Sequence, residues 1–88
     1  IFPKDSYRIL TVITTNEVDQ TQLINKIKSK TVKILFFDFN RNYETGITTA
    51  KMSLCFTHKG RIDKLSHSII KSLESMDIPL KSISWSHP

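Results

Sequence analysis

The chain has 88 residues, of which 39% are hydrophobic and 9% are aromatic. This length and composition predict one globular domain with a modest core and exclude a disordered tail. No run of about 18 apolar residues occurs, so these residues contain no candidate membrane-spanning helix. The net charge of +5 suits an anionic partner, although the basic residues are spread along the chain as on an ordinary solvated surface.

The chain opens with a predicted strand followed by a helix. Residues 6–15 are rich in β-branched side chains, which favour a strand. Asn16 is placed to cap the helix that follows. Leu23, Ile24 and Ile27 give that helix an apolar stripe at helical spacing.

A second strand is predicted over residues 32–40. Simple alternation places one apolar set on the first face: Val32, Ile34 and Phe36. It places another apolar set on the second face: Leu35, Phe37 and Phe39. A strand that is apolar on both faces suits the centre of a sheet, or a position where another chain covers its second face.

The second half of the chain predicts a hairpin, a helix and a last strand. Residues 42–46 have turn composition, with Gly46 free to take a positive φ. Apolar and polar side chains alternate over residues 47–58, which predicts a strand buried on one face. Residues 61–76 carry the clearest amphipathic helical pattern, and residues 80–86 predict the final strand.

The element order is strand–helix–strand–strand–helix–strand. Two helix-crossed halves joined by a hairpin correspond to an α+β, ferredoxin-like βαββαβ fold. We therefore expect a four-stranded antiparallel sheet with two helices on one face. The other face of the sheet is then open or covered by a partner.

Side chains that could carry catalysis or bind a metal are few and scattered. Asp63 and His67 are neighbours on the second helix and His58 lies just before it, which is too small a set for a convincing metal site. Cys55 is the single cysteine, so it forms no internal disulfide, and no activating base stands beside it. With two glycines the chain has no glycine-rich phosphate loop. The sequence therefore predicts no catalytic residues, no metal site, no cofactor and no enzyme.

Nucleic acid is a less favoured partner. Ferredoxin-like domains that bind RNA stack bases on aromatic side chains of the sheet face. Phe37, Phe39 and Tyr43 could supply such a platform beside basic residues. The third strand, however, offers Ser53, Cys55 and Thr57 on its outward face, where aromatic residues would be needed.

The ends of the chain carry a family resemblance. The last strand follows an apolar-x-x-apolar-x-Trp pattern through Leu80, Ile83 and Trp85, and residues 7–12 are similar to the first strand of the same family. Over residues 6–86 the chain resembles the C-terminal cytoplasmic domain of the MgtC/SapB family of bacterial inner-membrane proteins. In that family an ACT-like βαββαβ domain follows a bundle of transmembrane helices.

The resemblance implies a domain organisation and a role. A single ACT-like domain would span residues 6–87, and residues 1–5 would be a flexible lead from a preceding membrane region. The domain would be a non-catalytic regulatory or protein-interaction module at the cytoplasmic face of the inner membrane. Its parent would be an MgtC-like protein linked to magnesium limitation and virulence. Its partners would include a membrane protein or the anionic membrane surface, which the basic charge favours.

The alternative is a stand-alone ACT-type domain that senses amino acids. Ligand-binding ACT domains have a glycine-containing turn after the first strand, whereas this chain has no glycine there. If an effector binds, the turn formed by Thr14, Thr15 and Asn16 is the expected place.

Self-association is a separate expectation. An apolar second strand in a sheet with one open face invites pairing, so we expect a homodimer through the sheet or a strand edge. The candidate interface residues are Phe37, Phe39 and Trp85.

Overall fold

A computed structural model describes residues 3–15 and 17–88. The elements follow the predicted order: β1 (Lys4–Thr14), α1 (Gln20–Ile27), β2 (Val32–Asn42), β3 (Ile47–His58), α2 (Asp63–Glu74) and β4 (Leu80–Ser86). Because β1 begins at Lys4, the last two residues of the expected lead belong to the sheet. Among the described residues, no helix is both long and apolar enough to cross a membrane.

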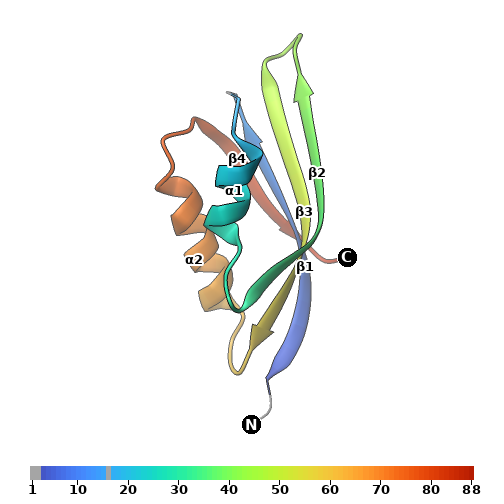
Figure 1. The fold of residues 1–88 in the computed structure, drawn as a ribbon, viewed down its shortest axis with the longest axis vertical. Coiled ribbons are helices and arrows are strands. Elements are labelled where there is room, and N and C mark those ends of the chain that lie inside the picture. The colour runs from blue at the N-terminus through green and yellow to red at the C-terminus, as the bar shows by residue number, and fades with distance from the viewer. Residues whose placement is uncertain (1–2, 16) are drawn as a thin grey trace.

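The four strands form one antiparallel sheet in the order β2-β3-β1-β4. Both helices lie on the same side of this sheet, as Figure 1 shows, and the opposite face is left open. The predicted ferredoxin-like architecture is therefore confirmed. The two edge strands are β2 and β4.

The core lies between the sheet and the helices. The two central strands supply its floor with alternating buried side chains: Leu10 and Val12 from β1, and Ala50, Met52, Leu54 and Phe56 from β3. The helices supply its roof with Leu23, Ile27, Ile69 and Leu73. The alternation predicted for residues 47–58 is confirmed, because the even-numbered residues from Ala50 to Phe56 are buried.

The face assignment predicted for the second strand is wrong from Phe36 onwards. Ile34 pairs with Leu54 and Phe36 pairs with Ser53, so Leu35 is an extra residue that forms a β-bulge. A bulge inserts one residue and reverses the alternation that follows it. Phe36 therefore leaves the core, while Phe37 turns towards the helices opposite Met52.

The start of the first helix also differs from the prediction. The side chain of Asp19 caps α1, because its Oδ1 accepts a hydrogen bond of 2.9 Å from the N–H of Thr21. Asn16, the predicted cap, lies outside the described residues. Asp19 lies four residues before Leu23. A helix that begins after Asp19 therefore has its first buried residue, Leu23, at the end of its first turn.

The β2–β3 hairpin closes with the predicted turn. Gly46 has a φ of 71°, and its N–H donates to the carbonyl oxygen of Asn42 at 2.8 Å. The Asn42 side chain accepts from the N–H groups of Glu44 and Thr45 at 3.0 and 3.2 Å. These bonds hold the end of the hairpin, which projects beyond the rest of the sheet in Figure 1.

Two leucines, one in the core and one at the bulge, provide a test of this arrangement. Leu54 is fully buried, so Leu54→Ala should lower the free energy of unfolding by about 2–5 kcal/mol. Leu35 is exposed, so its truncation removes little buried surface. Leu35→Ala should change the free energy of unfolding by no more than about 0.5 kcal/mol. Urea unfolding of both variants in dilute solution measures the difference, and equal losses would contradict the register of β2.

Candidate functional site

A hollow of about 450 Å³ lies where the β1–α1 connection meets β2. The connection contributes Glu17, Val18 and Asp19, and β2 with its turn contributes Phe39, Arg41 and Tyr43. Pairing of Arg41 with Thr48 places both on the helix-covered side of the sheet, beyond the main core. The hollow is therefore formed by two segments that are distant in sequence and brought together by the fold.

The effector turn predicted from the sequence lies at the beginning of this connection. Thr14 is buried at the end of β1, and Thr15 is exposed. The N–H of Thr15 donates to the carbonyl oxygen of Pro79 at 3.3 Å, which ties the connection to the start of β4. Asn16 lies outside the described residues, and the residues that line the hollow include neither Thr14 nor Thr15.

Arg41 is the most constrained polar side chain of the hollow. Its side chain is 21% exposed, and its Nη1 donates to the Thr48 hydroxyl at 2.6 Å. The guanidinium carbon stands 5.8 Å from the centre of the Tyr43 ring, a cation–π distance. Thr48 and Tyr43 thus hold the guanidinium in one orientation.

The Nε atom of Arg41 is left without a hydrogen-bond acceptor among the described residues. Glu17 Oε1 is 3.7 Å away, close enough for charge attraction but too far for a hydrogen bond. The Glu17 side chain is 77% exposed and therefore free to move. A buried N–H without an acceptor is costly, and a carboxylate oxygen is the acceptor that a guanidinium binds best. The arrangement can receive a carboxylate.

Sequence reasoning did not single out Arg41. Its position depends on the bulge at Leu35, because alternation counted from Val32 places Arg41 on the opposite face. The only sequence signal was a basic residue next to an aromatic one, Arg41 before Asn42 and Tyr43 at a turn. That signal is common on protein surfaces and specifies no site by itself.

The predicted interface residues lie on the helix-covered side of the sheet. Phe37 and Phe39 stack with their ring centres 6.2 Å apart and pack against the core. Trp85 packs against Phe56, with ring centres 6.0 Å apart. The aromatic platform considered for RNA binding is therefore not assembled on the open face, where Phe36 stands instead.

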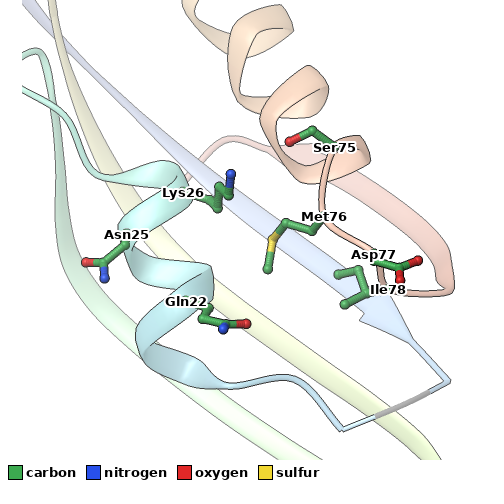
Figure 2. Close-up of a pocket in the computed structure, with 7 residues that line it drawn as sticks. All are labelled: Gln22, Asn25, Lys26, Ser75, Met76, Asp77 and Ile78. Atoms are coloured by element: carbon green, nitrogen blue, oxygen red, sulfur yellow. The ribbon is translucent and has the colours of Figure 1, made fainter.

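A second furrow runs between α1 and the segment after α2, as Figure 2 shows. Its volume is about 510 Å³, and it is lined by Gln22, Asn25, Lys26, Ser75, Met76, Asp77 and Ile78. The Met76 side chain points towards α1 and is half-buried, whereas the charged Lys26 and Asp77 are exposed. Among the described residues that line this furrow, no buried polar side-chain atom lacks a hydrogen-bond partner, so the furrow lacks the feature that distinguishes the Arg41 hollow.

The open face contains a buried thiol beside an exposed phenol. Cys55 is buried and stands between Tyr7 of β1 and Lys33 of β2. Negative charge on the Cys55 sulfur, and then on Asp5, raises the pKa of Tyr7 above its usual value. Within the described residues, no group of three histidine, cysteine or acidic side chains is close enough to hold a metal ion.

Comparison with known proteins identifies the fold. No protein-family model and no curated protein matches the sequence. The structure is similar to the ACT domain of a GTP pyrophosphokinase from Chlorobium tepidum, with a TM-score of 0.67 and 17% identity over 94% of this chain and 100% of that one. It is also similar to an uncharacterized protein from Thermotoga maritima, with a TM-score of 0.64 and 12% identity over 94% of this chain and 96% of that one.

These likenesses define the class of fold. The chain has the ACT-like form of the ferredoxin fold, a four-stranded antiparallel sheet with two helices on one face. The expected ACT-like architecture is confirmed.

The Tyr7–Cys55 pair gives a test on the open face. In a Tyr43→Phe background, Tyr7 is the one remaining tyrosine, and its phenol should ionise above the usual pH in ultraviolet titration. Because the pKa of Tyr7 is higher in the folded chain, the phenol ionises first in the unfolded chain. The free energy of unfolding should therefore fall as the pH rises from the usual tyrosine pKa through the raised pKa of the folded chain. Cys55→Ser removes the first cause of this shift and should return the pKa of Tyr7 towards its usual value. An unchanged pKa in that variant would contradict the assignment.

Proposed function

We propose that this chain is a non-catalytic, ACT-type regulatory domain that binds a free amino acid at the β1–α1 connection. The observation that carries the proposal is Arg41, whose mostly buried guanidinium keeps one N–H without an acceptor beside a hollow. A ligand carboxylate would supply the missing acceptor. The fold supports a regulatory role, because a structural neighbour is described as the ACT domain of an enzyme.

The other groups of the hollow suit the remaining parts of an amino acid. Glu17 is an exposed carboxylate near the guanidinium and would accept a hydrogen bond from the ligand's ammonium group. Phe39 and Tyr43 provide apolar surface for a ligand side chain. Asp19 is less suited to direct binding, because its Oδ1 already caps α1.

The absence of glycine from the turn bears on which contacts the ligand makes. A glycine there would let the backbone approach a ligand closely. In this chain the connection has Thr15 and Glu17 instead, and a side chain of β2, Arg41, is the group aimed at the hollow. The proposed site therefore depends on a side chain rather than on backbone N–H groups.

Titration of the protein with each of the common amino acids by calorimetry tests the proposal. At least one should bind saturably to the wild-type domain. Arg41→Gln removes the charge that the carboxylate would pair with, and should weaken binding at least about tenfold. Arg41→Lys keeps the charge but loses the planar fork and should also weaken it.

Arg61 provides a matched control. Its guanidinium is exposed and pairs with Asp63 at 2.8 Å, ahead of α2. Arg61→Gln removes the same charge from the chain without touching the hollow, so its affinity should equal that of the wild type. The proposal fails if no amino acid binds, or if Arg41→Gln and Arg61→Gln bind equally well.

A second candidate is the regulatory domain of an MgtC-like membrane protein. It is favoured by the final strand, in which Leu80, Ile83 and Trp85 follow the pattern of that family and face the core together. The genomic sequence upstream of this domain tests it. A run of four or five hydrophobic helices there would support a membrane-bound parent, and a different preceding region would contradict it. Amino-acid binding by the domain is compatible with either parent.

A further inference from the structure

The open face of the sheet presents an apolar cluster that the core does not use. We call it the face cluster: Tyr7, Ile9, Leu35, Phe36 and Cys55. The strand register places its members side by side, because Tyr7 pairs with Cys55, and Ser53 lies between Ile9 and Phe36. Leu35 is the bulge residue next to Phe36.

The exposure of this cluster is large for a chain of this size. Phe36 is 63% exposed, Leu35 is 57% exposed and Tyr7 is 49% exposed. Such contiguous apolar surface on a small domain marks a place where another molecule packs. The bulge determines which side chains of β2 belong to it, since it places the successive residues Leu35 and Phe36 outside the core.

The charges around the cluster indicate the kind of partner. The register of β1, β2 and β3 places four charged residues around the cluster, the cations Lys33 and Lys51 and the anions Asp5 and Asp38. These four charges sum to zero, whereas the whole chain carries +5. An anionic partner such as nucleic acid gains no net attraction from these four charges. A second copy of the chain meets no net repulsion there.

The order of the charges along β2 is also self-complementary. Lys33 and Asp38 stand on this face on either side of Phe36, opposite Cys55 and Lys51 respectively. Consider a twofold axis that lies between the two sheets, perpendicular to the strands and at the level of Phe36. This axis makes the two β2 strands antiparallel. It therefore places Lys33 of each copy over Asp38 of the other, as an isologous interface requires.

We propose that a second copy of this chain covers the open face, with the two face clusters packed against each other around Phe36. The face is large enough, because it spans the 50 Å and 19 Å directions of the molecule, with the helices stacked along the third, and a stable interface needs about 800 Å² per partner. The edge of β2 is a poorer alternative, since the bulge interrupts the ladder that a partner strand would extend.

Sedimentation of the full chain at several concentrations tests the inference. The wild type should sediment as a dimer of the 10.2 kDa chain. Phe36→Asp places a charge at the centre of the interface and should raise the dissociation constant at least about tenfold. Tyr43→Ser is the matched control, because Tyr43 is a more exposed aromatic residue outside the face cluster, and its dimer should persist. Circular dichroism verifies that both variants are folded.

A charge exchange distinguishes the proposed packing from other dimers. Lys33→Asp and Asp38→Lys should each weaken the dimer by placing like charges opposite each other, and the double variant should regain affinity. A monomeric wild type at the highest soluble concentration would overturn the inference. So would a Phe36→Asp dimer as tight as the wild type, or a double variant no tighter than the single ones. The Arg41 hollow lies on the other side of the sheet, so these outcomes do not decide whether the hollow binds an amino acid.

Discussion

The bulge at Leu35 determines how β2 divides its side chains between the two faces of the sheet. Before it, Val32 and Ile34 face the helices, and after it Phe37, Phe39 and Arg41 do so. Without the extra residue the period of two would send that later set to the open face. The core would lose two phenylalanines, and Arg41 would stand on the wrong side of the sheet to meet the β1–α1 connection. One inserted residue thus sets both the packing and the position of the candidate site.

The parts of the fold that follow from periodicity alone could be predicted from the sequence. The alternation in residues 47–58 and the stripe through Ile69 and Leu73 each contain enough repeats to identify strand and helix. The bulge could not be predicted in this way, because residues 34–37 are apolar throughout and every register buries an apolar side chain there. The cap of α1 was misplaced for a related reason, since Asn16 and Asp19 are both good capping residues and tertiary packing selects between them.

The candidate site was harder to predict than the fold. A turn after the first strand could be proposed from the resemblance alone, but its chemistry depends on a residue of a different strand. Arg41 is about 25 residues beyond that turn, and its approach depends on sheet register, the bulge and the hairpin together. A sequence pattern records neighbours along the chain, whereas this hollow is made by neighbours in space. The same limit explains why Phe37 and Phe39, attractive as interface residues, turned out to pack against the core.

Strand β2 connects the two proposed sites physically. It contributes Arg41 to the hollow on the helix-covered side and Phe36 to the face cluster on the open side. A ligand that fixes Arg41 also restrains the hairpin, through the hydrogen bond from Arg41 to Thr48 of β3. If ligand binding changes the twist of that hairpin, it changes the surface that a second copy meets. Linkage then requires the reverse effect with equal free energy, so that dimer formation changes the affinity for the ligand by the same factor. If both proposals hold, β2 would transmit the effect of binding at one face of the sheet to the other.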